Sequence, residues 1–245
     1  MLHFTLQIAG IAVGVACTFE STRVFCSDYL CTLEPVFSVA VCPEDIDFER
    51  AKSAREDALE GHPVRHYSDA YLETLAVQRK ITEGLFDHGI LLFHGSVIAV
   101  DGIGYLFTAK SGTGKSTHTR LWQQHFGSRA VMVNDDKPFL CLTPDAVLAC
   151  GSPWSGKHGL DTNITVPLGG ICILERGQEN SIRPMDTKEA LPFLLTQCDP
   201  PEDAAQLPLY HRLMEDLAAR VPLWHMYCTK DLQAAQIAFD AMQKP

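Results

Sequence analysis

The stretch 109–116 reads Ala-Lys-Ser-Gly-Thr-Gly-Lys-Ser, which fits the phosphate-binding loop pattern with Ala in place of the first Gly. Gly112 and Gly114 allow the backbone to point its N–H groups at an anion. Lys115 brings a full charge for the β- and γ-phosphates of a nucleotide, and the Ser116 hydroxyl is placed to reach Mg²⁺. The pattern predicts a phosphate site with the contact residues Ser111, Gly112, Thr113, Gly114, Lys115, Ser116 and Thr117. The alternative interpretation is a Gly-rich turn before a helix, with an exposed lysine.

Two adjacent carboxylates, Asp135 and Asp136, follow the apolar run 130–134. A carboxylate at the end of a strand beside a phosphate-binding loop is placed to hold Mg²⁺ or its water ligands. A second carboxylate can accept the proton of an attacking hydroxyl. We interpret Asp135 as the metal partner and Asp136 as the base, and the reverse assignment stays open. A solvated turn is the alternative for this pair, and the nearby loop favours the site.

Further cations follow later in the chain. Lys157 lies in a Pro/Gly-rich stretch, 151–159, and is a candidate for the extra cation that spreads charge in the transition state of phosphoryl transfer. An exposed loop lysine is the alternative. Arg176 is a weaker candidate for the same role. We expect His118, Arg120 and Trp122 to serve the surface and the packing of the helix after the loop.

These side chains need particular elements to hold them. The sequence predicts a hairpin over 90–108 with its turn at 101–104, because Asp-Gly between two β-rich runs is a strong turn signal. A helix should follow from 116 and end at Gly127. The remaining pattern mixes strands and helices, so the fold class is α/β. The further predicted strands are 130–134, 139–142, 146–150, 171–175 and 222–227, and the further predicted helices are 188–197, 203–219 and 230–243.

The N-terminal part is predicted to be a β-rich region, 1–88, before a nucleotide-binding domain, 89–245. One or two strands should cover 2–18, with a bend or bulge at the glycines 10 and 14, and another strand 36–41. A helix should run from 43 to near Gly61. A second helix, capped by Ser68 or Asp69, should bury one face made of Tyr71, Leu72, Leu75, Ile81 and Leu85.

Taken together, the motifs resemble the HPr kinase/phosphorylase family. That family carries a His-Gly on a strand, a hairpin, an S-G-x-G-K-S loop, a helix, and a strand ending in Asp-Asp. Here the matching residues are His94-Gly95, the loop 111–116, and Asp135-Asp136, in the same order and at similar spacing. The resemblance covers about residues 90–175 and hardly touches the first 85.

The resemblance implies a P-loop kinase fold related to phosphoenolpyruvate carboxykinase, with ATP and Mg²⁺, and γ-phosphate transfer to a serine-type hydroxyl. It gives His94 the role of assisting the Asp that activates the acceptor, and we expect this histidine to titrate near neutrality. A strand histidine bonded to backbone is the alternative. The family resemblance also suggests a homo-oligomer. Thr117 stands where the family usually has an acidic residue, and the loop 151–159 differs in chemistry, which indicates a different acceptor.

Three functions fit these observations. The first is a kinase acting on a hydroxyl of a protein, peptide or small molecule. The second is an ATP-binding regulatory module without phosphotransfer, which would need no base. The third is a carboxykinase-like enzyme, for which we locate no metal-binding His/Lys cluster and no Arg for a substrate carboxylate.

Composition limits the classes further. The 245 residues are 46% hydrophobic and 20% charged, which excludes a disordered chain. The net charge of −10 opposes nucleic-acid binding. The start, 1–19, lacks Lys and Arg and is interrupted by polar residues and Gly, so we expect no signal peptide, no membrane span and a cytoplasmic location. The nine cysteines form no C-x-x-C pair, and we expect free, buried thiols.

Overall fold

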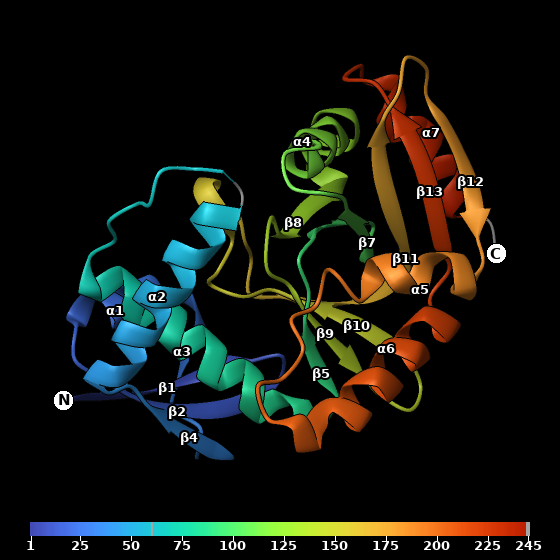
Figure 1. Ribbon diagram of the computed structural model, residues 1–245. Helices are drawn as coiled ribbons and strands as arrows, with labels where there is room; N and C mark the ends of the chain where they lie inside the picture. The colour runs from blue at the N-terminus through green and yellow to red at the C-terminus, as the bar shows by residue number, and fades with distance from the viewer. Residues whose placement is uncertain (60, 244–245) are drawn as a thin grey trace. The chain divides into compact units, whose positions relative to one another are not determined.

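The computed structural model describes residues 1–59 and 61–243, and the chain divides into two compact units, Met1–Leu85 and Phe86–Pro245. The predicted boundary at 88/89 lies three residues later in the chain than this division. The mixture of helices and strands confirms the α/β class (Figure 1).

The N-terminal unit is a four-stranded sheet, in the order β3-β1-β2-β4, with three α-helices. A two-residue turn joins its first two strands, with positive φ at Ala9 (49°) and Gly10 (83°), as hairpins of this type require. The predicted bulge at Gly14 is wrong, because the register of the two strands is continuous there. Gly14 instead leaves room for Ser38, whose Oγ would lie 2.4 Å from an added Cβ. The elements are β1 (Leu2–Ile8), β2 (Ile11–Cys17), α1 (Glu20–Phe25), β3 (Leu30–Cys31), β4 (Phe37–Ala40), α2 (Pro43–Leu59) and α3 (Asp69–Leu85), with a 3-10 turn η1 (Ser27–Tyr29).

Helix α3 is the central helix of this unit. Leu72, Ile81 and Leu85 are fully buried, as predicted, whereas Tyr71 is 46% exposed and does not belong to the buried face. The buried carboxylate of Glu73 accepts hydrogen bonds from the backbone N–H groups that precede the short helix α1 and from the Thr22 hydroxyl. A remote side chain therefore holds the segment at the start of α1 in place, and a local pattern in the sequence does not reveal such a contact.

The C-terminal unit is built on a nine-stranded sheet with the order β5-β9-β10-β11-β7-β6-β8, and β13 pairs with β11 and β12. The strands are β5 (Ile90–Leu92), β6 (Ser96–Val100), β7 (Ile103–Thr108), β8 (Ala130–Asn134), β9 (Phe139–Leu142), β10 (Val147–Cys150), β11 (Thr165–Arg176), β12 (Ser181–Met185) and β13 (Leu223–Cys228). The α-helices are α4 (Lys115–Phe126), α5 (Thr187–Leu194), α6 (Leu207–Arg220) and α7 (Gln233–Met242). Single-turn 3-10 helices lie at η2 (Phe86–His88), η3 (Gly127–Arg129), η4 (Gly156–His158) and η5 (Ala204–Gln206).

Successive buried side chains of the strands point to opposite faces of the sheet, and they form two apolar cores, one on each face. On β11, Ile171 and Ile173 pack with α5 and α6, whereas Cys172 and Leu174 pack with α4 and α7. The side chains of β7 are distributed between the two cores in the same way. Because both faces of these strands are covered, the strands read as continuous apolar runs in the sequence.

The predicted hairpin over 90–108 is only partly right. Strands β6 and β7 form a hairpin whose turn is Asp101-Gly102, with φ of 53° and 84°, so the next two residues already belong to β7. Residues 90–92 form a separate strand, β5, which pairs with β9. The chain between β5 and β6 therefore leaves the ladder at Phe93, His94 and Gly95.

Candidate active site

The predicted phosphate-binding loop, 109–116, connects β7 to α4 with the geometry that its glycines allow. Gly112 and Gly114 have φ of +73° and +125°, where an L side chain is strained. A Cβ on Gly112 would meet nothing within 4 Å, so the loop is open on that side. Helix α4 begins after Gly114, and among the described residues no side chain caps it. Its first N–H groups are therefore suited to an anion.

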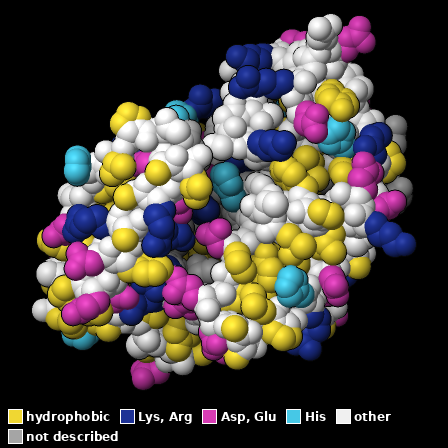
Figure 2. Space-filling model, viewed as in Figure 1, with side chains coloured by type: hydrophobic (Ala, Val, Ile, Leu, Met, Phe, Trp, Pro, Cys, Tyr) yellow, Lys and Arg dark blue, Asp and Glu magenta, His cyan; other side chains and the backbone are white. Residues whose placement is uncertain are grey.

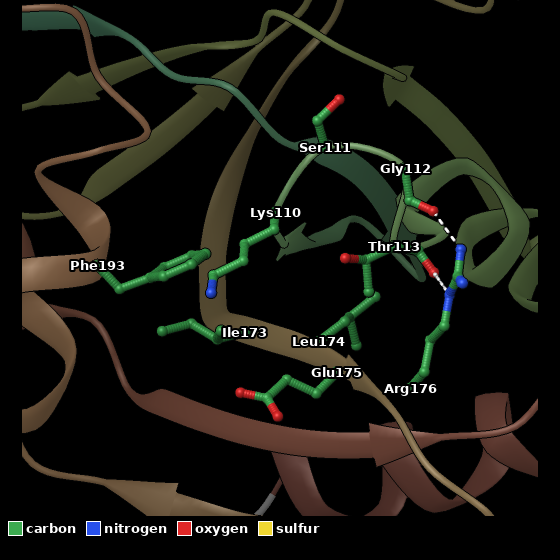
Figure 3. Close-up of a pocket in the computed structure, with 9 residues that line it drawn as sticks. All are labelled: Lys110, Ser111, Gly112, Thr113, Ile173, Leu174, Glu175, Arg176 and Phe193. Carbon is green, nitrogen blue, oxygen red and sulfur yellow. Dashed lines mark hydrogen bonds between the residues drawn. The ribbon is translucent and has the colours of Figure 1, made fainter. Parts of the chain in front are cut away.

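An open pocket of about 680 Å³ lies beside this loop (Figure 3). In Figure 3, the Lys110 side chain points toward Phe193 of α5. The pocket combines backbone of the loop with apolar and charged side chains of β11. Its lining residues are Lys110, Ser111, Gly112, Thr113, Ile173, Leu174, Glu175, Arg176 and Phe193.

Three predicted site residues from separate segments meet next to the loop. The Lys115 Nζ lies 3.0 Å from the Nε2 of His94, and the same Nε2 lies 3.5 Å from the Oδ1 of Asp136. Lys115 is half-buried rather than exposed, which contradicts the alternative of a solvated loop lysine. The fold thus places the loop cation, the histidine and one carboxylate in a single cluster.

The pKa values of this cluster are set mainly by burial. Burial, together with the charges of Lys115 and Lys137, lowers the pKa of His94 to about 3. The expectation that His94 titrates near neutrality is therefore wrong. A neutral imidazole accepts the hydrogen bond of Lys115 at Nε2, so this nitrogen has no proton to donate to Asp136. Burial lowers the pKa of Lys115 and raises the pKa of Asp136, the latter against the opposing effect of the two lysines.

Asp135 lies deeper than Asp136, and its side chain is held by two hydroxyl groups. It is 4% exposed, and its Oδ1 accepts a hydrogen bond of 2.7 Å from the Ser96 hydroxyl and a longer one of 3.4 Å from Thr119. Sequence reasoning missed Ser96 and Thr119. The signal was available, because Ser96 directly follows His94-Gly95 and Thr119 lies one helical turn after the loop.

Asn134 arranges the end of strand β8. Its Oδ1 accepts hydrogen bonds from the N–H groups of Asp136 and Lys137, at 2.8 and 2.7 Å. Its amide group donates to Ser152, which connects this turn to the loop 151–159. The Asx-type turn therefore fixes the direction in which Asp136 leaves the strand.

Gln197, three residues after the end of α5, is a further residue that sequence reasoning missed. Its backbone oxygen accepts the N–H of His94 at 2.7 Å, and its side-chain oxygen accepts the hydroxyl of Thr108 at 2.9 Å. The same hydroxyl also lies 3.0 Å from the backbone oxygen of His94. Gln197 thus joins the histidine to the strand that carries the phosphate-binding loop. No local pattern points to it, since the contacts span about ninety residues.

The other predicted site residues lie at the edge of the cluster. Ser116 is half-buried and Thr117 is exposed in the first turn of α4. Lys157 is exposed on η4, while its neighbour Gly156 packs so closely on Asp136 that an added Cβ would lie 3.0 Å from the Asp136 Cβ. The loop that carries Lys157 therefore reaches the carboxylate.

The helix residues that we expected to serve packing and surface do so. His118 and Trp122 are buried, and the Trp122 indole donates to the Nε2 of His118 at 3.1 Å. Arg120 is exposed. Burial lowers the pKa of His118 to about 4.

All nine cysteines are free thiols, of which five are buried and Cys42 is exposed. The described residues contain no cluster of three or more His, Cys, Asp or Glu side chains suited to a metal ion. In the same part of the chain, no helix has both the length and the apolar character needed to cross a membrane.

Comparisons with known proteins give distant structural similarity. The sequence matches no family model and no curated protein. Among solved structures, the chain is similar to the Hpr(Ser) kinase/phosphatase from Coxiella burnetii, with 12% sequence identity and a TM-score of 0.39 over 62% of this chain and 97% of that one.

Proposed function

We propose that the protein transfers the γ-phosphoryl group of Mg·ATP to a hydroxyl group of an acceptor that is a protein, a peptide or a small molecule. One observation carries this proposal. The Nε2 of His94 lies 3.0 Å from the ammonium group of Lys115 and 3.5 Å from the carboxylate of Asp136, so the imidazole joins the loop cation to the carboxylate beside the predicted phosphate-binding loop. Phosphoryl transfer needs mainly positioning, charge neutralisation and a proton acceptor, and this cluster supplies all three.

The residues of the loop and its surroundings fit a nucleoside triphosphate. The loop has glycines at positive φ, open space at Gly112, and a helix whose first turn lacks a side-chain cap in the described chain. Lys115 adds a cation that is already partly desolvated, so its attraction to a phosphate is less screened by water. Figure 2 shows Lys and Arg side chains gathered over the region of α4, although the whole chain has a net charge of −10. This local excess of positive charge favours an anionic ligand.

Asp136 is the proton acceptor in this proposal. The acceptor hydroxyl gives its proton to the Asp136 carboxylate while its oxygen forms a bond to the γ-phosphorus. The bond between the γ-phosphorus and the β,γ-bridging oxygen breaks, and ADP leaves with that electron pair. The raised pKa of Asp136 suits this role, because a carboxylate is a stronger base when burial disfavours its charge.

Asp135 and Ser116 are the residues proposed to hold Mg²⁺, directly or through water. Ser96 and Thr119 both bond Oδ1 of Asp135, which leaves Oδ2 for the ion or its water ligands. When bound, the ion would neutralise charge on the β- and γ-phosphates. Lys157 is proposed as an additional cation that approaches on its loop when substrates are present.

His94 contributes as a neutral group. It accepts the hydrogen bond of Lys115 and lies against Asp136, so it keeps the cation and the base at a fixed separation. The role that the family resemblance gave to His94, assistance to the base, is therefore proposed to be steric and dipolar rather than acid–base.

The test is phosphotransfer by the purified full chain with γ-labelled ATP, Mg²⁺ and a panel of serine-containing proteins, peptides and small hydroxy compounds. We expect labelled acceptor with the wild type and much slower labelling with Asp136→Asn, while the exposed-residue control Asp145→Asn keeps full transfer. ATP binding without transfer to any acceptor would favour the regulatory module instead. Absence of ATP binding would overturn the proposal.

A further inference from the structure

Arg176, the last residue of β11, is bonded to the backbone of the phosphate-binding loop (Figure 3). Its Nη2 donates to the carbonyl oxygen of Gly112 at 2.6 Å, and its Nε donates to the carbonyl oxygen of Thr113 at 3.2 Å. Two donors of one guanidinium therefore hold two consecutive peptide groups. This contact differs from the transition-state role that the sequence suggested, because these donors face carbonyl oxygens of the protein.

The contact fixes the direction of a peptide N–H. In a trans peptide the C=O and the following N–H point in opposite directions. Because the Thr113 carbonyl points at Arg176, the N–H of Gly114 points to the other side of the loop. The N–H of Thr113 is already bonded to the Lys110 oxygen at 3.1 Å, so the Gly114 N–H is the donor that the guanidinium orients toward a phosphate.

The loop needs such an anchor because glycines flank Thr113. Gly112 and Gly114 populate positive and negative φ with similar ease, so their peptide groups rotate readily in an isolated loop. Strand β11 is a firm support for the anchor, since it runs parallel to β7 with Ile173 opposite Thr108 and buries residues on both faces. The planar fork of Arg reaches two acceptors at once, which the single ammonium of Lys does not do in the same way.

We propose that Arg176 is a positioning residue that pre-organises the phosphate-binding loop for its anionic ligand, which deepens the proposed function and rests on it. The guanidinium selects the loop conformation in which the Gly114 N–H and the first N–H groups of α4 face the phosphates. Its charge also offsets the partial negative charge of two carbonyl groups next to the anion. Arg176 thereby acts on ligand binding through the loop backbone and not by contact with the reacting phosphoryl group.

The experiment measures ligand binding and loop order in the full chain. The variants are Arg176→Met, which removes both hydrogen bonds, Arg176→Lys, which keeps the charge and one donor, and the control Arg212→Met, which removes an exposed arginine on α6. The ligands are Mg·ATP and Mg·tripolyphosphate, which shares the phosphates but has no nucleoside. Calorimetry gives the dissociation constants, and amide hydrogen exchange of the ligand-free protein reports on residues 110–115.

We expect Arg176→Met to weaken ATP and tripolyphosphate by the same factor, about five- to tenfold for two partly exposed, charge-assisted hydrogen bonds. Exchange in 110–115 should become faster, while the rest of the chain exchanges as in the wild type. Arg176→Lys should show a smaller loss of affinity and a smaller increase in exchange than Arg176→Met. If Arg176→Met does not fold, Arg176→Lys provides the test. Arg212→Met should leave the dissociation constants and exchange unchanged.

Two results would overturn the proposal for Arg176. Unchanged affinity and unchanged exchange in both Arg176 variants would remove the positioning role, and a loss confined to ATP would place Arg176 at the nucleoside instead. Lys115→Met separates these failures from failure of the proposed function. If the wild type binds both ligands and Lys115→Met binds neither, the phosphate site stands and only the role of Arg176 falls. If the wild type binds neither ligand, both proposals fall.

Discussion

The Nζ of Lys115 lies 3.0 Å from the Nε2 of His94, so the cation of the phosphate-binding loop already has a partner inside the protein. Lys115 comes from the start of α4, and His94 from the segment where the chain leaves β5. Because His94 is neutral, it holds the ammonium group without competing for its charge. In the proposed function, an incoming phosphate would meet a lysine whose position is set in advance, which lowers the entropy lost on binding.

Lys115→Met should abolish stabilisation by Mg·ATP. A ligand at a hundredfold excess over its dissociation constant stabilises a protein by about 2.7 kcal/mol, and this gain should vanish without the cation. Thermal unfolding with and without Mg·ATP measures it, with Lys188→Met on α5 as an exposed control. The ligand-free melting temperature should change little, because Lys115 is a partly desolvated charge with a lowered pKa. A shift of wild-type size in Lys115→Met would place the phosphate site elsewhere.

His94→Ala should lower phosphotransfer by about 10²-fold, the loss that a small misplacement of positioned groups causes, because the histidine sets the separation of Lys115 and Asp136. Because its pKa is about 3, the rates of wild type and variant should depend on pH in the same way between pH 6 and 8. Initial rates at several pH values check this. An inflection near pH 6.5 in the wild type that the variant lacks would show that His94 titrates during turnover. A preserved rate per folded molecule would reduce His94 to a structural residue.

Asp135→Asn and Asp136→Asn should separate metal binding from chemistry. Asp135→Asn should raise the Mg²⁺ concentration needed for half-maximal ATP binding, since Ser96 keeps the side chain in place while the charge is lost. Asp136→Asn should leave ATP binding near that of the wild type and lower kcat. Titrations of Mg²⁺ and single-turnover rates distinguish the two effects. The opposite pattern would reverse the assignment, and full transfer in both variants would remove the pair from the reaction.

Local signals in the sequence were sufficient where one segment determines its own structure. The loop 109–116, the Asp101-Gly102 turn and the ends of α4 and β8 all depend on neighbouring residues, and the structure has them close to their predicted places. The α/β class followed from the succession of such segments. The hairpin predicted over 90–108 was only partly right, because the apolar run over 90–100 holds two strands that pair with different partners, β9 and β7.

Contacts between distant segments were outside the reach of such signals. Gln197 bonds to His94 and Thr108, and Arg176 bonds to Gly112 and Thr113, across many residues of chain. The neutral state of His94 was missed for the same reason, since its low pKa comes from burial and from lysines that the fold brings near. A residue type predicts a chemistry, whereas its charge state depends on the tertiary structure.

The buried histidine of α4 should make the C-terminal unit less stable below pH 6.5. His118 is 2% exposed with a pKa of about 4, below its ordinary value of 6.5, because burial disfavours the charged form. Between these values the unfolded chain binds a proton that the folded unit does not, so stability is complete above pH 6.5 and falls as the pH decreases toward 4. The slope from this histidine is about 1.4 kcal/mol per pH unit.

His118→Gln keeps an acceptor for the Trp122 indole and removes the titration, so its free energy of unfolding should fall less between pH 6.5 and 5 than that of the wild type. The exposed-histidine control His211→Gln should keep the wild-type slope. Urea unfolding at pH 6.5 and pH 5 measures the difference. Tryptophan fluorescence is a suitable probe, because all three tryptophans, Trp122, Trp154 and Trp224, lie in the C-terminal unit and report its unfolding alone. Equal slopes in wild type and His118→Gln would mean that His118 is protonated in the folded protein, and burial would then not control its charge.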